Sequence, residues 1–223
     1  MIITELATIC EENGLMLDHT MRLAMEAYAR LLTRWNSKIN LISRKDEAHI
    51  LDRHILHSLT LAMPAISGYD FQNTRVLDIG TGGGLPGIPL KIVIPSLDMT
   101  LVDSTQKKIA AVNEMIANLG LTGIRAIAAR AEELAKAPEE AHSYDVIISR
   151  AVAPLEDLVK WSRELLKPDG VLFSLKGGDL SEEIQLANRL KGVTSIEAKP
   201  LDLKGYPDFQ REEKKLVRVD FAG

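Results

Sequence analysis

The sequence predicts an α/β fold, in which a mostly parallel sheet covered by helices follows a helical segment at the N-terminus. Two observations predict this fold. From Arg75 onward, short apolar runs alternate with amphipathic stretches, which is the pattern of successive strand-helix-strand units. Before residue 70, apolar residues recur at the spacing of a helix. We therefore expect two regions, a helical segment over residues 1–70 that packs on a sheet domain over residues 71–223.

The composition is that of an ordinary folded protein without membrane segments. The chain has 223 residues, of which 46% are hydrophobic and 26% charged, so it can bury a core of normal size. No run approaches the roughly 20 apolar residues that a membrane-spanning helix needs, and the N-terminus lacks the pattern of a secretory signal. The single Cys10 forms neither an internal disulfide nor a cysteine zinc site, which fits a reducing compartment. These features predict a cytoplasmic protein.

Two apolar stripes indicate the helices of the N-terminal segment. The first stripe consists of Leu23, Ala27, Leu31 and Trp35. The second stripe consists of Leu51, Ile55, Leu59 and Ala62, just before Pro64. Residues four positions apart lie on one face of a helix, so each stripe is expected to face the core. Proline lacks the backbone N–H of a helix interior, so the second helix is expected to end at Pro64.

Seven strands are expected in the second region, because seven runs have the composition and length of strands. They occupy residues 75–79, 99–103, 124–129, 144–149, 171–176, 193–203 and 214–221. The helices between them are expected after Gly87 and over residues 104–119, 154–166 and 180–191. Residues 167–170, with the sequence KPDG, are expected to form a turn before the fifth strand.

The turn after the first strand is rich in glycine. The stretch VLDIGTGGGLPGIPL, from Val76 to Leu90, places Gly80, Gly82 and Gly84 at that turn. In an open parallel sheet, ligands bind beyond the carboxyl ends of the strands, and the turn after the first strand is the usual place. Glycine lets a ligand approach the backbone and allows a positive φ. The turn therefore predicts a site for a nucleotide-like molecule, although a tight connection without a ligand is the alternative.

Two common nucleotide-binding motifs do not fit this turn. A P-loop requires Lys and then Ser or Thr after its last glycine, but Ile88 and Pro89 follow Gly87. A dinucleotide fingerprint requires a glycine at the position of Leu85. Neither a phosphate cradle nor a pyrophosphate site is therefore expected here.

Two acidic residues remain as candidates for ligand contacts, Asp78 before the glycines and Asp103 at the end of the second strand. A carboxylate at the end of the second strand accepts hydrogen bonds from ribose hydroxyls. A carboxylate before the glycines orders the loop or binds a cationic amino group. S-adenosylmethionine has a ribose, an amino-acid tail and a sulfonium cation but no phosphate, so it suits both charges. A salt bridge of Asp103 with Lys107 or Lys108 is the structural alternative.

Several motifs together resemble one bacterial family. They are VLDIGTGGGLPGIPL, LVDSTQKK, RAEEL, ISRAVAPL and LKGG, with RWNSKINLIS and RHILHSL upstream. On these motifs, which run from about Trp35 to Lys176, the chain resembles the glucose-inhibited division protein B family, the 16S rRNA (guanine(527)-N(7))-methyltransferases. The resemblance implies transfer of a methyl group from S-adenosyl-L-methionine to a guanine of 16S rRNA, with S-adenosyl-L-homocysteine as the product.

The resemblance also implies a fold and a set of site residues. The fold is a Rossmann-like class I methyltransferase sheet of seven strands, the last one antiparallel, behind an N-terminal helical segment. The expected cofactor-binding residues, including those of the turn described above, are Asp78, Gly80, Gly82, Gly84, Leu85, Asp103, Ala131, Glu132 and Arg150. Asp103 is implied to bind the ribose. Ala131 and Glu132 are implied to flank the adenine, and Arg150 is implied to lie beside cofactor and substrate.

Three positions depart from the family pattern. His57 stands where relatives carry Asp, Lys214 stands where an Arg precedes the last strand, and Gly83 replaces Pro or Ala. The first two are expected near the RNA-binding face, so they bear on substrate contacts more than on the reaction.

The residue types agree with methylation of guanine N7. A pyrimidine C5 methyltransferase needs a cysteine nucleophile, and Cys10 lies in the helical segment far from the strand ends. Exocyclic amines are usually methylated at an Asp/Asn-Pro-Pro-aromatic loop, where this chain has SRAVAP. Guanine N7 carries a lone pair and no proton, so positioning supplies much of the rate without a general base. Arg150 is our candidate for holding guanine O6 or the RNA backbone, and a structural ion pair with a carboxylate such as Glu132 is the alternative.

RNA contacts are expected to be local, because the net charge of the chain is −4. Residues 22–57 carry seven basic and four acidic side chains, and residues 199–218 carry six and four. These segments are the expected RNA-binding surfaces, although solvated helix faces show similar excesses. His54 and His57 lie three apart on a helix, but no third ligand is nearby in sequence, so no metal site is expected.

Two other functions remain open from the sequence. One is a non-catalytic ribosome-associated factor that binds S-adenosylmethionine only for stability. The other is a small nicotinamide-dependent oxidoreductase, which Asp103 would suit, but the chain lacks the third glycine and a Tyr-x-x-x-Lys pair. As partners we expect 16S rRNA or the small ribosomal subunit and no membrane, and we expect a monomer.

Overall fold

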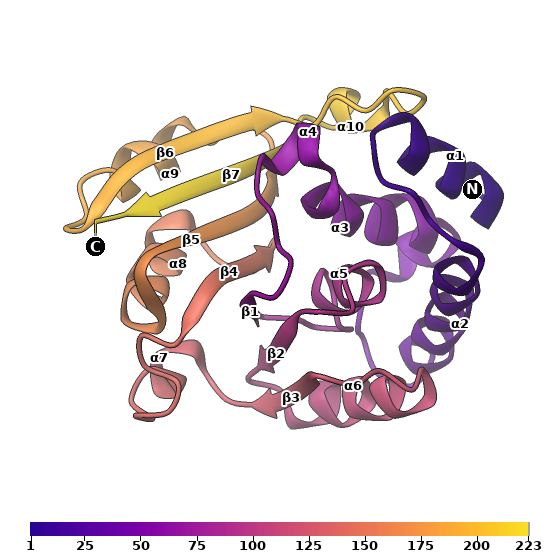
Figure 1. The fold of residues 1–223 in the computed structure, drawn as a ribbon, viewed down its shortest axis with the longest axis horizontal. Helices are drawn as coiled ribbons and strands as arrows, with labels where there is room; N and C mark the ends of the chain where they lie inside the picture. The colour runs from indigo at the N-terminus through magenta and orange to yellow at the C-terminus, as the bar shows by residue number, and fades with distance from the viewer. Residues whose placement is uncertain (223) are drawn as a thin grey trace.

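The computed structural model describes residues 1–222 and contains one sheet of seven strands (Figure 1). The strands are β1 (Arg75–Ile79), β2 (Asp98–Asp103), β3 (Ile124–Ala128), β4 (Tyr144–Arg150), β5 (Leu166–Gly177), β6 (Val193–Pro200) and β7 (Lys214–Phe221). Their order is β3-β2-β1-β4-β5-β7-β6. β1 to β5 pair in parallel, whereas β7 pairs antiparallel with both β5 and β6. The predicted sheet is confirmed, including its antiparallel last strand.

Both faces of the sheet are covered, which explains why successive apolar residues of the central strands are buried. In β1, Val76 belongs to one core cluster and Leu77 to the other, because successive side chains of a strand point to opposite faces. The first cluster includes residues of α5 (Gly87–Val93), α6 (Gln106–Asn118) and the N-terminal helices. The second includes residues of α7 (Ala131–Leu134), α8 (Leu155–Leu165) and α9 (Ser181–Ala187).

The N-terminal segment is helical but irregular. It contains α1 (Ile3–Glu12), α2 (His19–Asn36), the 3-10 helix η1 (Arg44–His49), the π-helix η2 (Ile50–Leu56), α3 (His57–Leu59), the 3-10 turn η3 (Thr60–Ala62) and α4 (Pro64–Ser67). Helical winding stops at Ala62, as predicted, and Pro64 then opens α4. In Figure 1, α1 and α2 lie on the right side of the molecule, and α2 packs beside α5. None of the described helices combines the length and hydrophobicity that a membrane crossing requires.

The buried face of α2 differs from the predicted stripe. Its buried residues are Met25, Tyr28, Leu32 and Asn36. The predicted stripe lies at the margin of this face, with Ala27, Leu31 and Trp35 half-buried and Leu23 52% exposed. The prediction was wrong because two of the buried residues are polar. The Tyr28 hydroxyl and the Asn36 carboxamide bond to backbone groups in the interior, so hydrophobicity alone misplaces the face.

The predicted turn at residues 167–170 lies inside β5. Tyr144 pairs with Leu166 and Val146 pairs with Val171, so residues 167–170 bulge out of the ladder between β4 and β5. Asp169, at φ +62°, makes the tight bend. The bend was therefore predicted correctly, but the strand begins at Leu166 rather than after the bend.

Polar residues mark both edges of the sheet. β6 is one outer strand, and its exposed side chains include Glu197, Lys199 and Pro200. β3 is the other, and its exposed Arg125 binds Glu140 at 2.6 Å. Arg125 lies at the start of β3 and Glu140 lies before β4, so this ion pair is at the amino edge of the strands, away from the carboxyl edge described next.

Candidate functional site

A cavity of about 700 Å³ lies at the carboxyl edge of the parallel strands. The turn after β1, the ends of β2, β4 and β5 and the start of α7 line one part of it. The other part is lined by residues from the N-terminal segment and from around the start of β7, which are Leu41, Ile42, Ser43, Asp46, Arg53, His54, His57, Glu212 and Lys214. In Figure 1, β4 runs towards the side of the sheet where α3 lies. The cavity therefore joins the sheet to the N-terminal segment.

Most of the predicted site residues line this cavity. They are Gly80, Gly82, Leu85, Asp103, Ala131, Glu132 and Arg150. Asp78 and Gly84 are not among its lining residues. The strand register explains the convergence, because Ile79 pairs with Val102 on one side and with Ser149 on the other. Three strands thus end side by side, and the residues after them meet.

Asp78 holds the glycine turn from behind. Its Oδ2 accepts hydrogen bonds from the Thr81 hydroxyl at 2.7 Å and from the Gly87 N–H at 3.0 Å. Burial raises the pKa of Asp78 to about 7, although these two hydrogen bonds oppose the shift. The side chain is fully buried and does not line the cavity. Of the two roles considered for this carboxylate, the geometry supports ordering of the loop.

Some glycines of the turn leave space that neighbouring side chains of the protein occupy. A Cβ at Gly80 would lie 2.5 Å from a methyl group of Val152, and a Cβ at Gly83 would lie 2.6 Å from a methyl group of Leu32. At Gly82, by contrast, the nearest atom to such a Cβ is a backbone oxygen 3.6 Å away. Gly82 is therefore the glycine of these three that leaves backbone open towards the cavity.

Asp103 joins the end of β2 to the turn after β1. Its Oδ2 accepts a hydrogen bond from the Gly82 N–H at 3.1 Å, and its Oδ1 accepts one from the Thr105 N–H at 2.8 Å. The Lys108 ammonium lies 3.7 Å from Oδ2. The predicted salt bridge and the predicted place at the cavity are thus both present, and the carboxylate stands next to the open backbone of Gly82.

The residues after β3 line the cavity at the start of α7. Ala131 is the first residue of this helix, and Glu132 follows it. The Glu132 carboxylate lies 3.8 Å from the Arg130 guanidinium. Within residues 1–222 it makes no ion pair with Arg150, so the structural alternative considered for Arg150 was wrong.

Arg150, the last residue of β4, is bound to a histidine from the N-terminal segment. Its Nη1 lies 2.7 Å from Nδ1 of His54. Among the described residues, no carboxylate lies within 4 Å of the guanidinium, and the buried Nε has no hydrogen-bond partner. Burial lowers the pKa of Arg150, while the nearby Tyr28 and Asp78 oppose the shift. Arg150 therefore retains donors that protein groups do not use.

The loop after Arg150 is tied to neighbouring elements. Lys176, near the end of β5, donates to the Ala153 carbonyl at 2.8 Å and to Glu183 at 2.7 Å. Glu183, on α9, also accepts from the Leu155 N–H at 2.8 Å. These bonds hold the segment that carries Val152 over Gly80. Sequence reasoning missed all of them, because they join different elements and no motif marks them.

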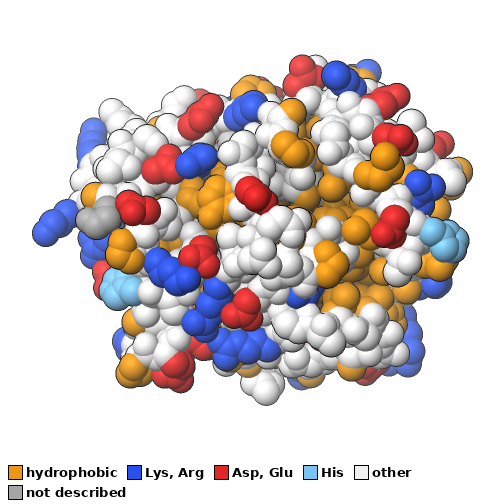
Figure 2. All heavy atoms as spheres, in the orientation of Figure 1, with side chains coloured by type: hydrophobic (Ala, Val, Ile, Leu, Met, Phe, Trp, Pro, Cys, Tyr) orange, Lys and Arg blue, Asp and Glu red, His pale blue; other side chains and the backbone are white. Residues whose placement is uncertain are grey.

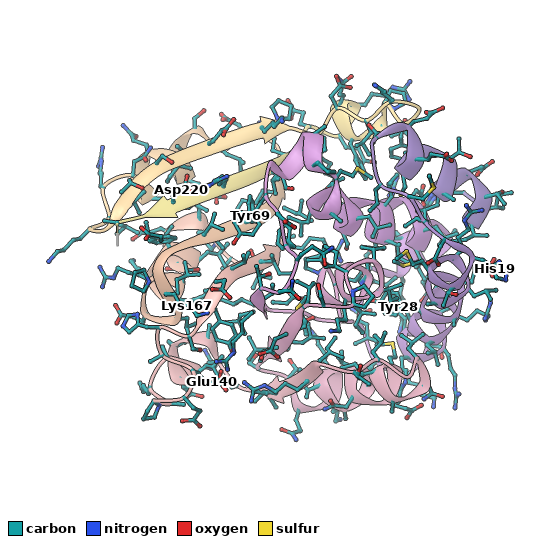
Figure 3. All side chains as sticks on the ribbon, in the orientation of Figure 1. His19, Tyr28, Tyr69, Glu140, Lys167 and Asp220 are labelled. Atoms are coloured by element: carbon teal, nitrogen blue, oxygen red, sulfur yellow. The ribbon has the colours of Figure 1, made fainter. Side chains whose placement is uncertain are left out.

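The N-terminal segment also fixes the turn and the cavity wall. The Tyr28 hydroxyl, on α2, donates to the Gly83 carbonyl at 2.8 Å. Figure 3 shows Tyr28 reaching from α2 towards the middle of the molecule. The Asn36 carboxamide oxygen accepts from the N–H groups of Leu41 and Ile42, which line the cavity. Neither contact has a signal in the local sequence.

His57 and Lys214, the two positions expected near the RNA-binding face, lie together at the cavity. Burial, and then the charges of Arg150 and Lys214, hold the pKa of His57 well below its usual range. The His57 ring packs against Phe209 with 5.1 Å between ring centroids, and the Lys214 ammonium lies 3.5 Å from the Glu212 carboxylate. The His57 imidazole is therefore neutral, so it does not repel the Lys214 ammonium, which pairs with Glu212.

Comparison with known proteins identifies relatives over most of the chain. A family model described as rRNA small subunit methyltransferase G matches residues 21–212. A protein of Chlorobaculum tepidum is 47% identical over 215 residues, which cover 94% of each chain. A protein of Thermoanaerobacter sp. is 37% identical over 214 residues, which cover 94% of this chain and 87% of the relative. Both relatives are named ribosomal RNA small subunit methyltransferase G.

Solved structures support the fold. A predicted O-methyltransferase of Agrobacterium tumefaciens, protein Atu636, has a TM-score of 0.59 at 17% identity, covering 75% of this chain and 81% of its own. The cyclase SpnF has a TM-score of 0.53 at 15% identity, with the same two coverages of 75% and 81%. The Rossmann-like class I methyltransferase fold is thereby confirmed. Because one of these two neighbours is a cyclase, the fold alone does not fix the reaction.

Proposed function

Because this chain belongs to the rRNA small subunit methyltransferase G family, we propose that it transfers a methyl group from S-adenosyl-L-methionine to N7 of guanine 527 in 16S rRNA. The family makes it an rRNA methyltransferase, and the guanine and its N7 atom come from the motif resemblance. S-adenosyl-L-homocysteine is the product that this reaction leaves. The observation that carries the proposal is one cavity in which the glycine turn, Asp103 and Arg150 meet.

The cavity suits an adenosyl ligand better than a dinucleotide. A pyrophosphate usually binds at the N-terminus of the helix after the glycine turn. Here the Gly87 N–H at that helix end already donates to Asp78. Asp103, by contrast, presents a carboxylate next to Gly82, where it can accept hydrogen bonds from the hydroxyls of a ribose. These contacts support an adenosine-containing methyl donor without phosphate.

The chemistry requires little of the protein beyond positioning. Bound S-adenosyl-L-methionine supplies a methyl group that its sulfonium makes electrophilic. Guanine N7 attacks with a lone pair and has no proton to lose, so alignment of the base supplies much of the rate. Arg150 lies between the part of the cavity that contains the glycine turn and the part that residues of the N-terminal segment line. We assign its guanidinium to guanine O6, with N7 left free to attack, or to an RNA phosphate, both of which accept charge-assisted hydrogen bonds from Arg.

We also propose that RNA reaches the cavity over the N-terminal segment and the start of β7. Arg53 lines the cavity with 42% of its side chain exposed, and it pairs with Asp46 at 2.7 Å and Glu212 at 3.6 Å. On the face drawn in Figure 2, Lys and Arg side chains are interspersed with Asp and Glu. This mixed charge supports a local RNA contact at the cavity rather than a broad basic surface on that face.

Neither alternative function gains support. The family consists of methyltransferases, so a role limited to cofactor binding is not favoured. The occupied helix end after the glycine turn argues against a nicotinamide dinucleotide. We further propose a cytoplasmic location and a monomeric enzyme, in which residues 1–70 act with residues 71–223 because both line the cavity.

The proposal is tested with methyl-labelled S-adenosyl-L-methionine and 16S rRNA that lacks the modification, presented both free and in the small subunit. We expect label at one guanine. An N7-methylated guanine loses its base after reduction, and aniline then cleaves the chain there, so primer extension locates the atom as well as the position. Absence of label from both substrates, or label at a site that resists this cleavage, would contradict the proposal.

A further inference from the structure

The partner of Arg150 is unusual for a half-buried guanidinium. Buried arginine charges are normally paired with carboxylates. Within residues 1–222, the sole hydrogen bond of this guanidinium is the 2.7 Å contact between Nη1 and Nδ1 of His54. Asp46 is the nearby acid on the other side of the imidazole, with its Oδ2 3.9 Å from Nε2 of His54. A histidine thus takes the place that a carboxylate usually fills.

The contact fixes the protonation of His54. A guanidinium has only donors, so Nδ1 must accept and the ring must carry its proton on Nε2. Burial, and then the charge of Arg150, lowers the pKa of His54 to about 4, which agrees with a neutral ring. The charged groups that face the imidazole are Arg150, Asp46, Asp52 and Arg53, with His57 as the neighbouring imidazole. The Nε2 atom is buried and has no hydrogen-bond partner among the described residues.

The histidine stands on a scaffold that holds it in place. It belongs to the π-helix η2, a form that occurs frequently at functional sites. Ile55 and Leu56, the next two residues, are fully buried. The His54 carbonyl accepts from the Ser58 hydroxyl at 2.7 Å. The imidazole therefore reaches the end of β4 from a fixed backbone, with 8% of its side chain exposed.

We propose that His54 is a positioning residue, whose neutral imidazole holds the Arg150 guanidinium towards the target nucleotide without neutralising its charge. The inference rests on the proposed function, because it assigns Arg150 to that nucleotide. A carboxylate in the same place would fix the guanidinium but would also compete for its positive charge. A neutral acceptor engages one N–H and leaves the other donors for a carbonyl or phosphate oxygen.

The test compares variants that keep or remove an acceptor near Nδ1. His54→Asn retains a side-chain oxygen at that distance from the backbone, whereas His54→Leu keeps volume and His54→Ala keeps neither. The control is His19→Ala, because His19 lies at the outer end of α2 (Figure 3). For each variant, kcat and KM for the rRNA substrate, the affinity for S-adenosyl-L-methionine and the thermal midpoint are measured.

We expect His54→Leu and His54→Ala to lower kcat about ten- to hundredfold, by analogy with hydrogen-bond partners that orient metal ligands. Cofactor affinity is expected to stay within about twofold, and His54→Asn is expected to recover most of the lost rate. In an Arg150→Ala background, His54→Ala should cause no further loss, because the two residues act as one unit. Histidine nitrogen NMR at pH 7 is expected to show the Nε2–H form of His54.

Each opposite result overturns the inference. It fails if the variants without an acceptor keep the wild-type kcat, if Asn is no better than Leu, or if the losses at His54 and Arg150 multiply. It also fails if the NMR signal of wild-type protein shows an imidazolium or the Nδ1–H form, a measurement that needs no variant to fold. Absence of methyl transfer by the wild type would instead remove the proposed function.

Discussion

At the scale of single residues, we propose different tasks for Asp103 and Arg150 at the cavity. Asp103 belongs to the part formed by the glycine turn, where its carboxylate accepts from the Gly82 N–H. Arg150 stands at the boundary with the N-terminal segment and is held by His54. Substitution of Asp103 is therefore expected to change cofactor affinity, and substitution of Arg150 is expected to change kcat.

Asp103→Asn is expected to weaken the binding of S-adenosyl-L-methionine. A neutral amide accepts hydrogen bonds from a ribose less strongly than a carboxylate, and the loss of one charge-assisted bond corresponds to about a tenfold rise in Kd. Titration calorimetry measures this. Asp98→Asn, at the exposed start of the same strand, is the matched control and should bind as the wild type does. Equal affinity of the Asp103 and Asp98 variants would contradict the assignment.

Arg150→Ala is expected to lower kcat for methyl transfer about a hundredfold, because the target nucleotide loses an orienting cation. Cofactor affinity should change by less than about threefold, since Arg150 is assigned to the RNA substrate rather than to the ribose. Arg163→Ala, on the exposed side of α8, serves as the control. Unchanged kcat and unchanged RNA affinity in the Arg150 variant would remove the role.

At the scale of elements, α2 acts as a clamp on the glycine turn. Tyr28 donates to the Gly83 carbonyl, and the methyl group of Leu32 occupies the space where a Cβ of Gly83 would stand. The helix therefore packs directly against the turn and leaves little room for a side chain at Gly83.

Tyr28→Phe is expected to destabilise the protein and to loosen the turn. The Gly83 carbonyl would lose its buried donor, which costs about 1 to 3 kcal/mol of unfolding free energy. Cofactor affinity should fall as well, because the same turn carries Gly82. Urea unfolding and calorimetry measure the two effects. Tyr69→Phe is the control, since Tyr69 lies on the sheet away from the turn (Figure 3). If both Phe variants have the same unfolding free energy and cofactor affinity, the proposed role of α2 in fixing the turn is contradicted.

The sequence predicts the elements of the sheet better than those of the N-terminal segment. Strands such as residues 75–79 follow from local apolar runs, and the structure confirms them. The face of α2 does not follow, because Tyr28 and Asn36 are polar residues whose partners lie outside this helix, in a turn and a loop. The 3-10 and π-helical segments between Arg44 and Ala62 were not predicted either, because apolar residues four positions apart indicate a regular α-helix.

At the scale of the whole molecule, the cavity is predictable in one half only. The glycine turn, Asp103 and Arg150 are marked by motifs at strand ends, and parallel strands bring such ends together. The other half depends on where residues 41–57 and 212–214 pack. Tertiary packing places His54 against Arg150, which are 96 positions apart, so no local pattern could pair them.

Three buried groups link global stability to pH in opposite directions. Burial and Arg150 lower the pKa of His54 to about 4, and burial holds the pKa of His57 well below the ordinary 6.5. Burial raises the pKa of Asp78 to about 7 from 3.8. Below pH 6.5 the unfolded chain therefore binds more protons at the histidines than the folded chain does, and fewer at Asp78. Acidification destabilises the fold through the histidines and stabilises it through Asp78.

His54→Asn is expected to make the protein less sensitive to acid. Between pH 6.5 and about 4.5, the wild type should lose roughly 2 kcal/mol more unfolding free energy than this variant, because it alone must keep an uncharged imidazole at that position. Asp78→Asn should shift the dependence the other way and lose more than the wild type. Urea titrations across this range measure both. Parallel stability curves for all three proteins would contradict the linkage.

The polar edges of the sheet have a consequence for the behaviour of the protein in concentrated solution. A bare outer strand offers unpaired N–H and C=O groups to other chains, which is a common route to aggregation. β6 ends in Lys199 and Pro200, of which the second has no N–H to offer, and the Lys199 ammonium binds the Ala65 carbonyl at 2.7 Å. The Lys199 charge, the missing N–H of Pro200 and the hydrogen bond from Lys199 to Ala65 all disfavour pairing of this end of β6 with a strand of another chain. Growth of fibres by strand addition is therefore not expected there.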